Sequence, residues 1–388
     1  MRRVYLGADN IITSLGFTTK ENAGQVMNGR TGIGIMADDR LYPGPVALSG
    51  IKDELLDAKV REITGKAGFA NSFTRLEKIF ILSISDALAA NSADPRDPRT
   101  IFVFSTTKGN IDLLESARRL LFEPDRIHLW RMAEVITHFF DNPNKPVIIS
   151  NACISGSAAI IAASRLIASG RYDKAVVTGG DIISGFVISG FQSFQALSPE
   201  ACKPFDARRN GLSLGEGCGT VILSAAANMA DHQQHTVEYL GGATTNDANH
   251  ISGPSRDGEG LYLAITAAMK EACVSSKDIG FISAHGTATP FNDEMESLAL
   301  DRAQLSHVPV NSFKGYIGHT LGASGIIETI LAAFSMRNNM LFKSAGYEEN
   351  GVTVPLNIIT ENRIQPVSHI LKTASGFGGC NAAIVMGY

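Results

Sequence analysis

The chain has 388 residues, of which 44% are hydrophobic and 19% charged, a composition typical of a globular protein with a large core. Its formal net charge is −4 at pH 7 and it has no run of Lys or Arg, which excludes the charge pattern of a nucleic-acid-binding protein. No apolar run is long enough to cross a bilayer, and the start, MRRVYLGADN, lacks the apolar segment of a secretion signal. The five cysteines are odd in number and include no CxxC pair. We therefore expect a cytoplasmic protein with no nucleic-acid partner and no membrane span.

Apolar periodicity predicts alternating strands and helices in the first half of the chain. The expected elements are strand 2–8, helix 20–28, helix 76–90, strand 101–104, strand 147–149, a helix ending at Gly170, strand 174–180 and strand 220–223. The segment STTKGNID after strand 101–104 is expected to turn into a further helix. The apolar, glycine-broken segment 183–198 is expected to be a flexible loop that suits an adjustable pocket wall.

The second half repeats this alternation. The expected elements are strands 236–243, 279–284 and 308–311, helices 259–273, 292–303 and 322–337, and a terminal hairpin-like pair in HILKTASGFGGCNAAIVMGY. The pattern predicts an α/β fold with parallel-rich sheets. The similar size of the halves, 1–225 and 226–388, suggests an internal duplication, although no sequence period proves it.

One cysteine lies where nucleophilic chemistry is favoured. Cys153 sits between the apolar run 147–149 and the helix ending at Gly170, so it is expected at a sharp strand–turn–helix corner. The positive end of the helix would favour its thiolate and lower its pKa. The alternative is a buried structural cysteine, the commonest role of a free cysteine.

Two histidines also follow strands. His285 stands at the carboxyl end of strand 281–284, and His319 follows strand 310–312 and a glycine-lined turn. Catalytic groups in α/β proteins favour that edge of a sheet, so the two side chains can converge. Either histidine alone is more often a hydrogen-bonding residue than a catalyst.

Metal and cofactor chemistry are the competing interpretations of these residues. A Cys/His/His zinc site needs a fourth ligand and a short-spaced pair, and neither is evident. Lys314 has no phosphate cradle near it that would suit pyridoxal phosphate. The glycines of segment 211–219 lack the GxGxxG spacing of a dinucleotide site. We therefore expect no metal and no cofactor.

Five segments, in order, resemble motifs of the β-ketoacyl synthases of type I/II, the condensing enzymes of fatty-acid and polyketide assembly. They are NACISGSAAI, FDARRNGLSLGEGCG, AHGTATPFND, KGYIGHTLGASG and SGFGGCNAAIV. The resemblance covers essentially the whole chain. It implies a thiolase-like fold of two duplicated halves in a five-layered αβαβα sandwich, with the cysteine in half 1–225 and both histidines in half 226–388.

The resemblance also implies an activity. The expected reaction is a decarboxylative Claisen condensation of an acyl group with a malonyl group, both delivered by acyl-carrier protein. Cys153 would hold the acyl group, and His285 and His319 would complete a Cys–His–His triad. Lys314 and Glu328 are expected to orient these histidines. A homodimer is expected, and a heterodimer is the alternative.

The remaining site residues come from the same resemblance. The backbone N–H groups of Cys153 and Phe377 are expected to bind the oxyanion of acyl transfer, with Phe377 as a gate beside the thiol. Further substrate contacts are expected from Phe191, Thr287, Thr289, Gly378 and Lys108.

The sequence departs from the family pattern at several positions. Ser283 and Ala284 replace the acidic residue before the first histidine, Ala288 replaces a glycine, and Cys380 replaces a threonine. Lys108 stands in STTKGN where the family has an aliphatic or small residue. Burying its ammonium unpaired is costly, so it must meet a carboxylate, reach water or contact a polar substrate. The sharper hypothesis is that Lys108 shortens the acyl tunnel.

Two alternative functions come from other classes. A non-catalytic chain-length partner would lack the cysteine that this chain has at position 153. A thiolase uses a second cysteine as base, and Cys380 lies near the corresponding place. An acidic carrier protein would dock on a basic patch, for which Arg208 and Arg209 are the candidates; a solvated loop is the alternative.

Overall fold

The structure is a computed structural model that describes residues 2–36, 44–64, 72–90, 93–115, 118–226 and 236–388. Ten strands of this part of the chain form one mixed sheet in the order β11-β10-β14-β15-β9-β1-β8-β6-β4-β5. Their bounds are β1 Val4–Thr13, β4 Thr100–Ser105, β5 Val147–Ile149, β6 Lys174–Asp181, β8 Gly217–Ser224, β9 Glu238–Asn246, β10 Phe281–Ser283, β11 Val310–Asn311, β14 His369–Gly376 and β15 Cys380–Gly387.

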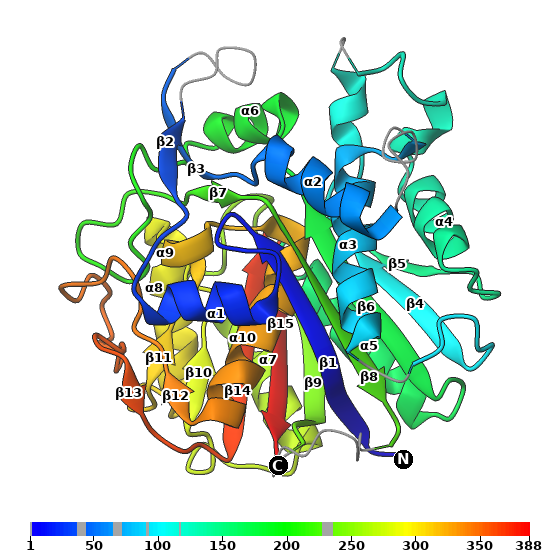
Figure 1. The fold of residues 1–388 in the computed structure, drawn as a ribbon. Coiled ribbons are helices and arrows are strands. Elements are labelled where there is room, and N and C mark those ends of the chain that lie inside the picture. Colours follow the sequence, from blue (N-terminus) through cyan, green and yellow to red (C-terminus); the bar gives the residue numbers. More distant parts are fainter. Residues whose placement is uncertain (1, 37–43, 65–71, 91–92, 116–117, 227–235) are drawn as a thin grey trace.

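The two halves of this sheet have the same topology. Outward from the centre, the first half runs β1-β8-β6-β4-β5 and the second runs β9-β15-β14-β10-β11. In each half the first two pairings are antiparallel and the next two are parallel. Figure 1 shows red β15 on one side of blue β1 and cyan β4 on the other. The sheet is therefore mixed rather than parallel-rich, and the expected duplication is visible in strand order. The boundary at 225 and 226 stays a prediction.

Helices cover the outer faces of the sheet, and two further helices lie between its two halves. The helices are α1 Thr19–Met27, α2 Asp53–Thr64, α3 Arg75–Ala89, α4 Leu129–Phe139, α5 Ser155–Ala168, α6 Gly185–Ser193, α7 Glu259–Glu271, α8 Pro290–Arg302, α9 Lys314–Ile317 and α10 Ser324–Asn338. Short 3-10 turns are η2 Ile111–Leu114, η3 Pro124–Ile127 and η4 Leu321–Ala323. Smaller sheets contain β2 Gly34–Met36, β3 Val46–Ser49 and β7 Leu214–Gly215, and β12 Met340–Leu341 and β13 Arg363–Ile364.

The central layer consists of α5 and α10, one from each half, and both contact strands of both halves. Their backbones touch, because a Cβ on Gly156 would lie 2.8 Å from the backbone N of Ile326. A Cβ on Gly325 would likewise lie 2.3 Å from the backbone N of Ser157. On the outside, α3 covers strands of the first half and α7 covers strands of the second. The order of layers is thus αβαβα, as the resemblance implied.

The expected strands and helices form at or near their predicted positions, with two corrections. Segment 183–198 is not a loop, because α6 forms within it and Ser184 Oγ accepts a hydrogen bond from the backbone N–H of Val187. The segment after β4 does not enter a full helix but makes only η2. Gly109, with φ of 57°, and the hydrogen bonds of its neighbours to Asp181 hold that segment in a tight turn.

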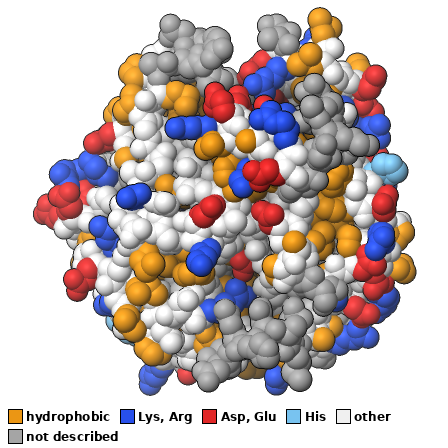
Figure 2. All heavy atoms as spheres, in the orientation of Figure 1, with side chains coloured by type: hydrophobic (Ala, Val, Ile, Leu, Met, Phe, Trp, Pro, Cys, Tyr) orange, Lys and Arg blue, Asp and Glu red, His pale blue; other side chains and the backbone are white. Residues whose placement is uncertain are grey.

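The surface is evenly charged on the face seen in Figure 2, where basic and acidic side chains are interspersed. Among the described residues, no helix combines the length and the apolar character needed to cross a bilayer.

Candidate active site

Cys153 lies at the predicted corner between β5 and α5. The strain of the corner falls on its neighbour Ala152, whose φ of 43° is unusual for a residue with a side chain. Ser155 fixes this turn, because its Oγ accepts from the backbone N–H of Asn151 at 2.8 Å and donates to the carbonyl of Ala152 at 2.6 Å. Cys153 is buried, with 7% of its surface exposed, at one wall of a cavity.

The environment of this thiol differs from the expectation. Burial raises the pKa of Cys153 to about 12, and neighbouring Cys380 acts in the same direction. The positive charges of Lys314 and Lys108 oppose this rise but do not overcome it. The pKa of the thiol is therefore raised rather than lowered as predicted, because burial outweighs any effect of the helix end, and the thiol is protonated at neutral pH.

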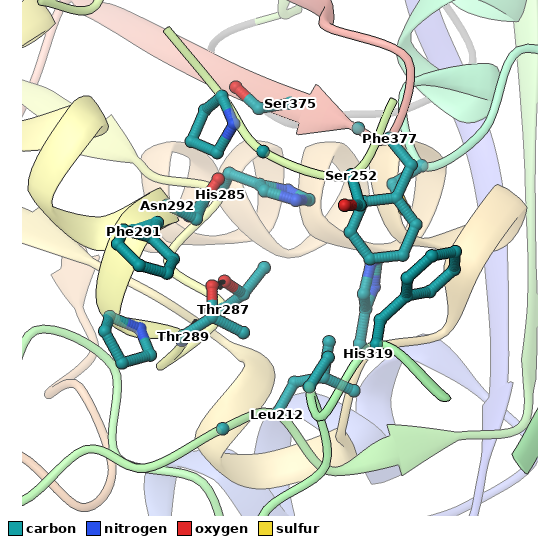
Figure 3. Close-up of a pocket in the computed structure, with 18 of the residues that line it drawn as sticks. Leu212, Ser252, His285, Thr287, Thr289, Phe291, Asn292, His319, Ser375 and Phe377 are labelled. Carbon is teal, nitrogen blue, oxygen red and sulfur yellow. Dashed lines mark hydrogen bonds between the residues drawn. The ribbon is translucent and has the colours of Figure 1, made fainter. Parts of the chain in front are cut away.

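His285 and His319 converge on the same cavity, as predicted. Both are buried, and their ring centroids lie 5.3 Å apart at an interplanar angle of 84°. Figure 3 shows both rings directed into the cavity, His285 from the segment after β10 and His319 from the turn after α9. Burial first, and then the charge of Lys314, hold the pKa of both imidazoles well below its ordinary value, so both are neutral at pH 7.

Neighbouring donors fix the tautomer of His285. The ammonium Nζ of Lys314 lies 3.3 Å from its Nδ1 and also donates to the His285 carbonyl at 2.7 Å and to Glu328 Oε1 at 2.5 Å. An ammonium group only donates, so Nδ1 accepts and the proton lies on Nε2. Lys314 thus contacts His285 directly and Glu328 contacts Lys314, both from buried positions, whereas the expected contact of this pair with His319 is not found among the described residues.

His319 is held in the same tautomer by a different set of contacts. The backbone N–H of Leu321 donates to its Nδ1 at 3.3 Å, and Ser324 Oγ lies 2.9 Å from the same atom. Its buried Nε2 has no hydrogen-bond partner among the described residues. Two neutral imidazoles therefore present Nε2–H donors to one cavity.

Carboxylates on α8 support the histidine loop, and the sequence analysis assigned them no role. Glu296 accepts from the backbone N–H groups of His285 at 2.8 Å and Gly286 at 2.7 Å. Asp293 accepts from that of Thr287 at 2.9 Å, and burial raises its pKa to about 6. The available signal was their spacing, one turn apart at the start of a helix that follows the histidine.

The glycine-rich segment before β8 supports His319 through backbone hydrogen bonds. The backbone N–H of His319 donates to the carbonyl of Ser213 at 2.7 Å, and that of Gly215 donates to the His319 carbonyl at 2.9 Å. A Cβ on Gly215 would lie 2.1 Å from the carbonyl oxygen of Ile317, so only glycine permits this approach. Gly215 thus helps to position His319.

A cluster of aromatic side chains, which includes Phe377 of the turn after β14, lies beside the thiol of Cys153. A Cβ on Gly376 would lie 2.9 Å from the backbone N of Cys153, which places the turn directly beside the thiol. The next residue, Phe377, packs against Phe191 at 5.5 Å and Phe194 at 5.2 Å between ring centroids. The cluster has the position expected of a gate.

The cavity has a volume of about 440 Å³ and brings together most of the predicted residues. It is lined by Cys153, His285, His319, Phe377, Phe191, Thr287 and Thr289. The hydroxyl oxygens of Thr287 and Thr289 lie 2.9 Å apart (Figure 3). Four predicted residues lie outside its lining: the substrate-contact residues Lys108 and Gly378, and the orienting residues Lys314 and Glu328.

The predicted docking residues are already engaged. Arg208 pairs with Glu348 at 2.6 Å and with Asp206 at 3.4 Å. Arg209 donates to backbone carbonyls, including that of Pro290 at 3.3 Å. The Arg208 side chain is 55% exposed and its pair with Glu348 is a surface ion pair, so carrier docking at these residues stays a prediction. In the part of the chain that the structure describes, no three His, Cys, Asp or Glu side chains form a set that could hold a metal ion.

Two protein-family models match the chain. Residues 9–228 match the family model described as the N-terminal domain of β-ketoacyl synthase, and residues 223–348 match that of its C-terminal domain.

Two curated relatives are both named 3-oxoacyl-[acyl-carrier-protein] synthase 2. The protein from Rhizobium meliloti (strain 1021) is 36% identical over 264 residues, which cover 65% of this chain and 62% of that protein. The protein from Vibrio cholerae serotype O1 is 31% identical over 303 residues, which cover 71% and 73%. The chain therefore spans less than two thirds of the first relative.

Solved structures share the fold over the full length. A β-ketoacyl synthase from Burkholderia phymatum STM815 has a TM-score of 0.87 at 25% identity, covering 100% of this chain and 99% of that one. A ketosynthase from Xenorhabdus doucetiae, solved in complex with its chain length factor, has a TM-score of 0.85 at 24% identity, covering 100% and 98%.

Proposed function

Because the chain belongs to the β-ketoacyl synthase family, we propose that it joins an acyl group held on Cys153 to a malonyl group held on acyl-carrier protein. The products are carbon dioxide and a β-ketoacyl thioester. The observation that carries the proposal is the convergence of one buried thiol and two neutral imidazoles on a single cavity.

The first step is transfer of the acyl group. The sulfur of Cys153 attacks the thioester carbonyl, the bond to the carrier sulfur breaks, and the thiol proton ends on the departing carrier thiol. The raised pKa of Cys153 makes proton removal part of this step rather than a condition of the resting site. Backbone N–H groups of Cys153 and Phe377 would bind the oxyanion that forms on the carbonyl.

The second step is decarboxylation of the malonyl group. Carbon dioxide leaves, and the electron pair of the broken bond is delocalised to the thioester oxygen as an enolate. The Nε2–H groups of His285 and His319 are suited to bind that oxygen, since both are donors and both imidazoles are neutral.

The third step forms the new carbon–carbon bond. The α-carbon of the enolate attacks the acyl carbonyl on Cys153, the bond to its sulfur breaks, and the thiolate regains a proton from solvent. Atoms and charge balance without any oxidant, reductant or cofactor.

The partners in this proposal are acyl-carrier protein and a second copy of the chain. Among the described residues β5 is the last strand of the sheet and its outer edge has no strand partner, which supports the dimer because exposed strand edges favour pairing. The half-exposed Trp130 on adjacent α4 adds apolar surface there. A non-catalytic role as a chain-length partner is disfavoured, because Cys153 and both histidines are in place.

The test is mass spectrometry with acyl- and malonyl-carrier thioesters. An acyl adduct on Cys153, followed by a β-ketoacyl product, supports the proposal. An adduct that persists in Cys153→Ala would contradict it.

A further inference from the structure

A second buried lysine lies behind the site. Lys372, on β14, is fully buried, and its Nζ lies 2.8 Å from Glu328 Oε2. Its ammonium also donates to the carbonyl of Thr373. The other oxygen of the same carboxylate, Oε1, lies 2.5 Å from Lys314 Nζ. One buried carboxylate thus holds two buried ammonium groups, one on each oxygen.

The carboxylate of Glu328 is connected to His285 through Lys314. The three donors of Lys314 are directed to Glu328 Oε1, to the His285 carbonyl and to His285 Nδ1. The orientation of Lys314 therefore depends on where Glu328 places its first oxygen. With only one oxygen bound, a carboxylate can rotate about its terminal torsion, which is broad. Lys372 restricts that freedom through its 2.8 Å ion pair with the second oxygen, which has no hydrogen-bond partner among the described residues, so the restraint is electrostatic.

We propose that Lys372 is a positioning residue of this condensation, which fixes Glu328 so that Lys314 is held against Nδ1 of His285. The inference rests on the proposed function and adds a residue to it. Lys372 does not line the cavity, and its ion pair connects it to His285 through Glu328 and Lys314. Its position on β14 is adjacent in register to Ser283, two residues before His285, so it is also close to the strand that carries this histidine.

The charge of Lys372 has a second consequence. It lowers the pKa of both His285 and His319, in addition to the effects of burial and of Lys314. The charged and titratable groups around this cluster are Lys314 on α9, Glu328 on α10, Glu296 on α8, Lys372 on β14, the two histidines themselves, and the thiols of Cys153 and Cys202, on which the charge of Lys314 acts. Removing Lys372 leaves two carboxylates with one ammonium, which makes both imidazoles easier to protonate.

The experiment compares Lys372→Met, which keeps the length of the side chain and removes its charge, with Lys277→Met at an exposed site. Two rates are measured on each: acylation of Cys153 by intact mass, and release of carbon dioxide from malonyl-carrier thioester across pH. We expect acylation of Lys372→Met to stay near the wild-type rate. Decarboxylation should fall by about 10- to 100-fold, the range that applies to loss of a residue orienting a metal-bound histidine. The acid limb of its pH profile should move up by about one pH unit.

Restored charge provides the rescue. Lys372→Arg should recover part of the decarboxylation rate and of the acid limb, whereas Lys277→Met should match the wild type throughout. Wild-type decarboxylation and pH profile in Lys372→Met would overturn the proposal. Equal losses of acylation and decarboxylation would also overturn it, because they indicate a structural role.

Two further measurements distinguish failure of this proposal from a folding defect and from failure of the proposed function. If Lys372→Met does not fold, Lys372→Gln replaces it and keeps a donor toward Glu328 without the charge. Loss of folding in both variants would mean that Lys372 serves stability, and the proposal would be wrong. Failure of the proposed condensation itself would be seen in the wild-type protein, which would then form no β-ketoacyl product.

Discussion

The carboxylate of Asp181 accepts a 2.7 Å hydrogen bond from the backbone N–H of Gly322. A buried acid at the end of β6, in the first half, is thus bound to the turn that follows His319 in the second half. The same carboxylate accepts from the backbone N–H of Thr107 at 2.9 Å and from Thr106 Oγ1 at 2.8 Å. It therefore couples the turn after β4 to the histidine turn.

Asp181→Asn should loosen both turns, because an amide has one acceptor oxygen where the carboxylate has two. We expect the free energy of unfolding to fall by about 1–3 kcal/mol, the cost of leaving a buried donor unpaired. Chemical denaturation measures this change, with the exposed Asp257→Asn as the control. Unchanged stability in Asp181→Asn would show that the turns are held by other contacts.

Cys153→Gln should separate condensation from decarboxylation. The variant cannot be acylated, so condensation is lost, but His285 and His319 remain to stabilise the enolate. Decarboxylation of malonyl-carrier thioester should therefore persist or increase, as measured by carbon dioxide release. If decarboxylation disappears together with condensation, the histidines do not act independently of the thiol.

His319→Ala should have the opposite effect. It removes one of two Nε2–H donors, and such a loss typically lowers the rate on the order of 10²–10³-fold. Acylation of Cys153 should continue, because it depends on backbone N–H groups. Intact-mass measurement of acylation and carbon dioxide measurement of decarboxylation, on the same preparation, test both expectations. Blocked acylation with normal decarboxylation would mean that the roles are reversed.

Local sequence patterns predicted much of this molecule. The strand–turn–helix corner of Cys153 and the positions of His285 and His319 after strands follow from apolar periodicity and turn residues, which act over short stretches. The α6 helix was missed because its glycines are poor helix formers, and the N-cap at Ser184 together with packing overrides that preference.

The failures of prediction concern properties that depend on tertiary environment. The raised pKa of Cys153 comes from burial by residues far apart in the sequence, which outweighs the local effect of the helix end. Lys372 and Asp181 lie in apolar strands, and only the assembled fold shows that Glu328 and Gly322 are their partners. Spacing alone does not carry that information.

The pH dependence of thiol alkylation tests the environment of Cys153. Because its pKa is raised to about 12, the reactive thiolate is scarce at neutral pH and its fraction grows with each unit of pH up to that value. The rate of alkylation should therefore rise throughout the range in which the protein stays folded. The exposed Cys273 is replaced by Ser to remove its background, and mass spectrometry follows the single adduct. A plateau near pH 7 would contradict the raised pKa.

Lys108 tests the acyl preference. It is half-buried, its charge acts on Cys153, and its ammonium forms no ion pair with the described residues. A carboxylate partner, one of the three possibilities, is thus not found among the described residues, and contact with water or with a polar substrate are the other two. Lys108 lies outside the lining of the described cavity, so the hypothesis requires a long acyl chain to extend past Cys153 toward its ammonium, where burying the charge unpaired is costly.

Lys108→Ile should therefore raise kcat/KM for long saturated acyl thioesters relative to short ones, by about 10-fold or more, the effect of one or two methylene contacts in an apolar pocket. Competition between acyl thioesters of increasing length, with products identified by mass spectrometry, measures this ratio. Lys277→Ile serves as the control, because it removes a lysine at an exposed site. If the wild-type protein already elongates long saturated chains as well as short ones, Lys108 does not limit the tunnel and its ammonium simply reaches water.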